Sequence, residues 1–182
     1  VSDNGIIAGM FSDTEYKSNH SATKLPGYYA DGKWHRMELP DTKVSSGIAY
    51  SISPDGHYVA GSVEVGFDFL AFIWKDGKIR RQLTQSGMAM AYAVAPDGET
   101  AAGWTYRDNR VACLWEADGS TTLLSNYQSF RSAANRFSAD GKKLVFWGGY
   151  DTSDPSIPRL KCLYDMESKE VGTVECMDGG QS

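Results

Sequence analysis

The sequence predicts an all-β fold, namely a β-propeller built from four repeats of four-stranded antiparallel blades. Three observations predict it. One motif recurs at spacings of 42 and 43 residues, a second motif follows each copy of the first, and turn residues separate short apolar segments. Four short strands in a unit of this length are typical of a propeller blade.

The first motif is an apolar segment that ends in an Asp-Gly turn. It reads AYSISPDG at 49–56, AYAVAPDG at 91–98 and ANRFSADG at 134–141, with a worn copy, VSDNG, at 1–5. Glycine accepts a positive φ without a Cβ clash, and aspartate accepts hydrogen bonds from nearby backbone amides. Each copy therefore predicts a hairpin turn with one strand on either side.

The second motif supplies another hairpin in each repeat. It reads AFIWKDG at 71–77 and ACLWEADG at 112–119, with weaker copies, YYADG at 28–32 and KCLYDM at 161–166. Trp74, Trp115 and Tyr164 occupy the same position in three copies. Because neighbouring repeats bury a shared face, we expect these aromatic side chains to pack between blades.

The strand order that follows places both tight turns of each blade on one face of the ring. Longer links are then expected on the other face, at about 11–26, 67–70, 106–111 and 148–158. Loops of uneven length gathered on one face are a common location for function.

The chain is expected to be one domain, 1–182, with repeats at about 1–40, 48–84, 90–124 and 133–175. The first copy begins at its turn, so its first strand is missing. Four blades can close a ring or belong to a larger one of about six to eight blades. Open edges invite pairing between chains, so self-association through them is an expected property.

Composition excludes some partners and gives little guidance on others. The formal net charge of −5 disfavours nucleic acid and anionic membranes, and no apolar run is long enough for membrane insertion. The three cysteines, Cys113, Cys162 and Cys176, have no metal-binding spacing and are expected to be small buried side chains.

The two motifs together carry a family resemblance over residues 1 to about 174. The pattern Ser-x-Asp-Gly-x-x-x-Ala-Gly followed by Ala-Phe-Ile-Trp resembles the bacterial extracellular HAF repeats. The turn at 53–56 also resembles the TolB-like propeller repeat, called PD40. The resemblance implies an exported bacterial protein that is periplasmic, secreted or displayed on the cell surface. It says little about activity.

Four aromatic residues are the candidate ligand-binding site. Trp104 and Trp147 each lie seven residues after a turn aspartate, where a strand is expected to enter the loop-bearing face, and Tyr106 and Tyr150 follow them. Aromatic side chains in such a cluster suit stacking on sugar rings or anchoring a protein partner. The alternative is that they close the core between the third and fourth blades.

The predicted function is a non-catalytic extracytoplasmic module that binds a protein or a glycan through its loop face. No nucleophile, acid–base or phosphate-binding motif is present, and no cofactor or metal site is expected. One alternative is a glycan-active hydrolase or lyase whose site lies partly in further blades. Another is a structural spacer in a larger surface protein.

Overall fold

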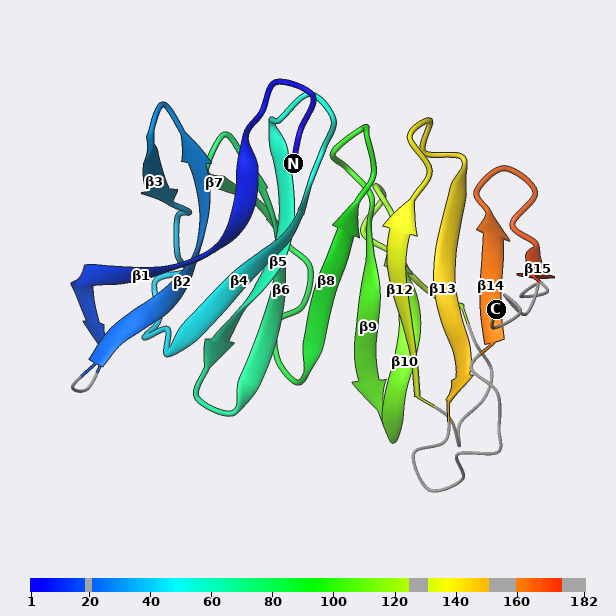
Figure 1. Cartoon of the computed structure of the whole chain (residues 1–182). Coiled ribbons are helices and arrows are strands. Elements are labelled where there is room, and N and C mark those ends of the chain that lie inside the picture. The colour runs from blue at the N-terminus through cyan, green and yellow to red at the C-terminus, as the bar shows by residue number, and fades with distance from the viewer. Residues whose placement is uncertain (19–20, 125–130, 151–159, 175–182) are drawn as a thin grey trace, which may run out of the picture.

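The computed structural model describes residues 1–18, 21–124, 131–150 and 160–174. Over these ranges the chain forms fifteen strands in four antiparallel sheets and no helix, so none could cross a membrane. The predicted all-β architecture is confirmed. In Figure 1 the sheets follow one another side by side in chain order, with the first and the last at opposite ends.

Each sheet is a meander of consecutive strands. The first contains β1 (Ile7–Ser18), β2 (Ser21–Ala30) and β3 (Lys33–Arg36). The second contains β4 (Ser46–Ile52), β5 (Tyr58–Val65), β6 (Asp68–Lys75) and β7 (Lys78–Gln82). The third contains β8 (Ala89–Val94), β9 (Ala101–Arg107), β10 (Asn109–Trp115) and β11 (Thr121–Leu123). The fourth contains β12 (Arg131–Phe137), β13 (Lys143–Tyr150), β14 (Leu160–Asp165) and β15 (Val171–Val174).

The first sheet differs from the other three because it has three strands in the described residues. The turn at Gly5 leads directly into β1, which forms one edge of this sheet. The other three sheets have the four strands expected of a blade.

Aspartate shapes the tight turns as the motif predicts. Asp55 Oδ1 accepts hydrogen bonds from the Ser53 hydroxyl and from the backbone N–H of His57, and Gly56 has a φ of +82°. The hydrogen bond from Ser53 is the main reason that the pKa of Asp55 is lowered. Both turns of the second sheet lie together, because His57 Nδ1 is 2.6 Å from Asp76 Oδ1.

The opposite ends of the middle sheets are tighter than expected. Val65 pairs with Asp68, so only Gly66 and Phe67 connect β5 to β6. The φ of +63° at Gly66 allows this two-residue turn. Arg107 likewise pairs with Asn109. The long links expected at 67–70 and 106–111 are therefore wrong, since most of those residues extend the strands.

The core consists of three clusters between successive sheets. The predicted inter-blade aromatics Trp74, Trp115 and Tyr164 are buried, one in each cluster. Their packing role is confirmed. The thiols of Cys113 and Cys162 are free and buried, as expected, and Cys176 lies outside the described residues.

A candidate ligand-binding groove on the inner strands

The innermost strands share an irregularity at the same motif position. In β4, Ala49 pairs with Gly61 and Ser51 pairs with Ala60, so Tyr50 has no partner in β5. Tyr92 is the corresponding extra residue in β8, and Asn135 is the corresponding one in β12. An extra residue in one strand is a β-bulge, which redirects the side chain beside it. Three sheets thus present one redirected residue each.

Glycine opposite the bulge makes the first two bulges possible. A Cβ at Gly61 would lie 2.2 Å from the carbonyl oxygen of Ile48. A Cβ at Gly103 would lie 1.8 Å from the carbonyl oxygen of Met90. Any other residue would collide with the backbone of the neighbouring strand, so these glycines are required by the close approach.

The three bulges line one groove of about 550 Å³. Equivalent positions of successive repeats form its wall. One row consists of Tyr50, Tyr92 and Asn135, and another of Ser51, Ala93 and Arg136. A third row comes from the turns and consists of Asp3, Pro54, Pro96 and Ala139. The groove therefore runs across the sheets along their innermost edges.

Tyrosine hydroxyls and a methionine connect the second and third sheets at this wall. The rings of Tyr50 and Tyr92 meet edge to face, with centroids 4.7 Å apart. Both hydroxyls donate to Met90 Sδ, at 3.4 Å from Tyr50 and 3.7 Å from Tyr92. The Tyr92 hydroxyl also accepts a 3.0 Å hydrogen bond from Trp104 Nε1. Because these contacts reinforce one another, the side chains of Tyr50, Tyr92 and Met90 are held in one arrangement.

The surroundings of Tyr50 favour the neutral form of its side chain. Partial burial, followed by repulsion from Tyr92, raises the pKa of Tyr50 to about 12, while Arg110 acts in the opposite direction. The Tyr50 hydroxyl is consequently protonated at neutral pH. Its proton is donated to Met90 Sδ, so its oxygen can accept a hydrogen bond from a ligand, and it is no base at that pH.

The fourth sheet changes the chemistry of the groove. Asn135 and Arg136 stand where the other sheets have Tyr50–Ser51 and Tyr92–Ala93. Arg136 is exposed, and neither side chain forms a hydrogen bond or ion pair with another described residue. A carboxamide and a guanidinium at this end offer several donors to a ligand, while Asp3 places a carboxylate at the first-sheet end.

The four aromatic residues singled out in the sequence do not form one surface. Trp104 is completely buried, and the Arg110 guanidinium covers its ring at 4.5 Å. Tyr106 is 53% exposed at the far end of β9. Trp147 is half-buried, with the Lys161 ammonium 5.5 Å from its ring centroid. The backbone of Tyr150 pairs with Arg131, and its side chain lies outside what the structure describes.

Sequence reasoning placed these residues on the first strand of each repeat but did not select them as a binding site. The signal was present in the second residue of each copy, which is Tyr, Tyr and then Asn. An aromatic side chain at the second position of a strand is normally interpreted as part of the core. Only the shifted register shows that this position faces the groove.

Among the described residues, the groove offers few groups that could act as an acid or a base. Asp3 is the one carboxylate among the residues that line it, so the described part of the chain supplies no acid–base pair there. Across the described residues, no three His, Cys, Asp or Glu side chains gather as metal ligands would.

Solved structures share the fold of this chain at low sequence identity. A TolB protein of Acinetobacter baumannii superposes with a TM-score of 0.64 and 14% identity, over 95% of this chain and 42% of that one. A TolB-type protein of Agrobacterium tumefaciens gives 0.62 and 17%, over 82% and 54%. Prolyl oligopeptidase B of Galerina marginata, solved with a 35mer hydrolysis and macrocyclization substrate, gives 0.55 and 12%, over 95% and 29%.

Sequence comparison alone adds no relative. No family model matches the sequence, and no curated protein matches it. The chain spans about half or less of the length of the solved structures with which it superposes. Its four antiparallel sheets, their meander order and these superpositions show that the chain has the fold of TolB-like β-propeller blades.

Proposed function

We propose that this chain is a non-catalytic binding module of an extracytoplasmic protein, and that its inner-strand groove takes an extended segment of a protein partner. The observation that carries the proposal is the repeated bulge. It brings Tyr50, Tyr92 and Asn135 into one groove and leaves Arg136 exposed beside them.

The lining favours a polypeptide over a sugar. A sugar stacks on an open ring face, and the edge-to-face contact between Tyr50 and Tyr92 occupies one face of one of these two rings. A peptide instead needs small apolar contacts and donors for its carbonyl groups. Ala93, Pro96 and the Asn135–Arg136 pair supply these contacts and donors. Glycan binding remains the alternative ligand class, and a structural spacer the alternative without a ligand.

An enzyme is the competing class of function. One structural neighbour is a peptidase, so a shared fold does not separate a binding module from part of a catalyst. A hydrolase or lyase would need an acid and a base close to the substrate. Because the described lining holds only Asp3, those groups would have to come from further blades.

The proposal is tested with peptides selected on the protein itself. A random peptide library displayed on phage is panned against the immobilised chain, and the affinity of the selected peptides is measured by fluorescence anisotropy. Arg136→Ala and Asn135→Ala should each weaken binding about tenfold if they anchor the ligand. Arg80→Ala is the matched control, because Arg80 is an exposed arginine on β7 that pairs with Glu99 away from the groove.

Two outcomes would contradict the assignment of the binding site to the groove. Peptides that bind Arg136→Ala and Tyr50→Ala as tightly as the unchanged chain occupy another surface. If Tyr106→Ala alone weakens them, the ligand sits on the hairpin face that the sequence favoured. Binding to a glycan array with no peptide selected would replace the protein partner by a sugar.

A further inference from the structure

The guanidinium group of Arg110 lies on a buried indole ring beside the groove. Its Cζ atom is 4.5 Å from the ring centroid of Trp104, a side chain with no exposed surface. Trp104 Nε1 donates a 3.0 Å hydrogen bond to the hydroxyl of Tyr92, whose side chain lines the groove. Trp104 therefore connects this cation to the wall of the groove.

No described residue neutralises the charge of Arg110. Its side chain is half-buried, yet it forms no ion pair or hydrogen bond with another residue of the described ranges. Asp108, two residues earlier on the same hairpin, is exposed and forms no such contact either. An aromatic ring attracts the cation but leaves most of its five N–H donors without an acceptor. A partly buried guanidinium in this state is stabilised when an anion binds it.

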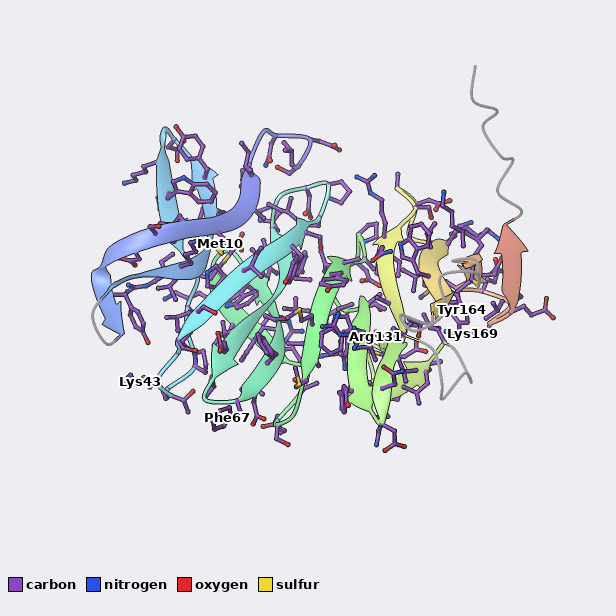
Figure 2. The ribbon with its side chains drawn as sticks, turned by 60° about the horizontal axis from the view of Figure 1, so that its bottom comes forward. Met10, Lys43, Phe67, Arg131, Tyr164 and Lys169 are labelled. Carbon is purple, nitrogen blue, oxygen red and sulfur yellow. The ribbon has the colours of Figure 1, made fainter. Side chains whose placement is uncertain are left out.

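A second arginine, Arg131, lies at the same end of the sheets. The Ser132 hydroxyl oxygen accepts a 2.7 Å hydrogen bond from the backbone N–H of Ala112 and so joins β12 to β10. Both strands run in the same direction (Figure 1), and Arg110 and Arg131 both precede this contact. Figure 2 brings this end forward and shows Arg131 beside the strands of the third sheet. Because like charges repel, two cations on neighbouring strands favour a negatively charged ligand.

The two arginines do not owe their exposure to an uncovered end of the chain. Arg110 alternates along β10 with Ala112 and Leu114, which are buried against the fourth sheet, so it lies between two described sheets. Met88 holds the position of Arg131 in the third sheet, three residues before the alanine of the first motif. Met88 is 37% exposed although the fourth sheet follows it. Exposure at this position therefore does not require an uncovered sheet.

The charge of Arg110 also acts on the groove. Partial burial raises the pKa of Tyr50, and Arg110 acts in the opposite direction. Tyr50 is 38% exposed in the groove, and its ring packs edge to face with that of Tyr92. A ligand that crosses Tyr50 therefore comes within the field of the guanidinium. A carboxylate is the polypeptide group that matches a guanidinium best, because it accepts two parallel N–H hydrogen bonds.

We propose that Arg110 binds an aspartate or glutamate side chain of the segment that occupies the groove, so that the chain selects an acidic partner segment. The inference rests on the proposed function and adds a charge requirement to it. Arg110 is then a specificity-determining residue, whereas Tyr50 and Tyr92 supply contacts that do not depend on the charge of the ligand.

The test uses two peptide libraries displayed on phage. One contains Asp and Glu at its random positions, and the other contains Asn and Gln in their place. We expect the chain to enrich peptides from the acidic library alone. Affinities of the selected peptides are measured by fluorescence anisotropy. Arg110→Gln should weaken binding roughly tenfold, and so should replacing one particular acidic residue of the peptide by its amide. The two changes together should weaken binding no more than either one does, because they remove the same contact.

Arg107→Gln is the matched control. Arg107 is an exposed arginine on the same hairpin, and alternation along β9 places it on the face opposite Trp104. Its removal should change the affinity by less than about twofold. Arg110→Lys keeps the charge but loses the two parallel hydrogen bonds, so it should bind more weakly than the unchanged chain and more tightly than Arg110→Gln. Urea unfolding confirms that each variant is folded.

The outcomes separate the charge requirement from the binding site. Amide-library peptides that lose affinity with Tyr50→Ala but not with Arg110→Gln overturn the inference and leave the proposed function standing. Losses from Arg110→Gln and from the peptide change that multiply overturn it as well, because the acid would then contact another residue. No selected peptide from either library overturns both.

Discussion

The indole N–H of Trp104 donates a 3.0 Å hydrogen bond to the hydroxyl of Tyr92, and it links the core of the third sheet to the wall of the groove. Trp104 has no exposed surface. Tyr92→Phe would leave its buried N–H without this acceptor, and the free energy of unfolding should fall by about 1–3 kcal/mol. Urea denaturation measures the change.

Tyr50→Phe is the control for this hydrogen bond. The Tyr50 hydroxyl donates only to Met90 Sδ, at 3.4 Å, and sulfur is a weak acceptor. Its removal should change stability by less than about 0.5 kcal/mol. Equal losses in the two variants would show that the bond to Trp104 contributes nothing of its own.

Gly103 tests the bulge that directs Tyr92 into the groove. A Cβ at Gly103 would meet the Met90 carbonyl oxygen at 1.8 Å, so Gly103→Ala must push β8 away from β9. We expect a loss of about 1–3 kcal/mol or more, or failure to fold. Gly172→Ala in β15 is the control, because its nearest neighbour there is 3.9 Å away. The urea midpoints of the two variants should differ clearly, and similar midpoints would remove the steric argument.

Ser62 tests how the second and third sheets are joined. Its buried hydroxyl accepts a 3.2 Å hydrogen bond from the backbone N–H of Ala91, beside the bulge at Tyr92. Ser62→Ala leaves that buried N–H without this acceptor and should cost about 1–2 kcal/mol in thermal or urea unfolding. Ser45→Ala, at an exposed residue, should be nearly neutral. A loss at Ser45 equal to that at Ser62 would contradict the link.

His57 gives the chain a pH-dependent contact between two turns. Its hydrogen bond to the Asp76 carboxylate, assisted by their charges, raises the pKa of His57 above the ordinary 6.5. A raised folded-state pKa stabilises the protein below the unfolded-state value, and the effect is lost as pH rises through the folded-state value. The urea midpoint of the unchanged chain should therefore exceed that of His57→Gln at about pH 5.5 and match it at about pH 9.

The same contact is visible directly by nuclear magnetic resonance. The imidazole protons of His57 should titrate above pH 6.5 in the unchanged chain and return toward that value in Asp76→Asn. Because both side chains are exposed, salt should weaken the shift. A titration midpoint that is identical in both proteins would mean that the pair does not form in solution.

The repeats allowed the architecture to be predicted from the sequence. Asp-Gly turns at fixed spacing define hairpins through local backbone chemistry alone, which is why the sheets and the aromatic positions Trp74 and Trp115 could be predicted. The two-residue turn at Gly66 was missed because glycine there is followed by Phe67, an unusual turn residue. A single Gly beside an aromatic residue does not distinguish a turn from a strand.

By itself, the sequence determined the all-β class, the four units, the direction of the turns and the residues that pack between sheets, because each depends on short-range patterns. Only the tertiary structure decided which aromatic side chains are buried and which line the groove. Trp104 and Tyr92 are both aromatic strand residues, yet Trp104 lies in the core and Tyr92 lines the groove. The register shift between β8 and β9 made that choice, because one extra residue turns a side chain toward a different surface.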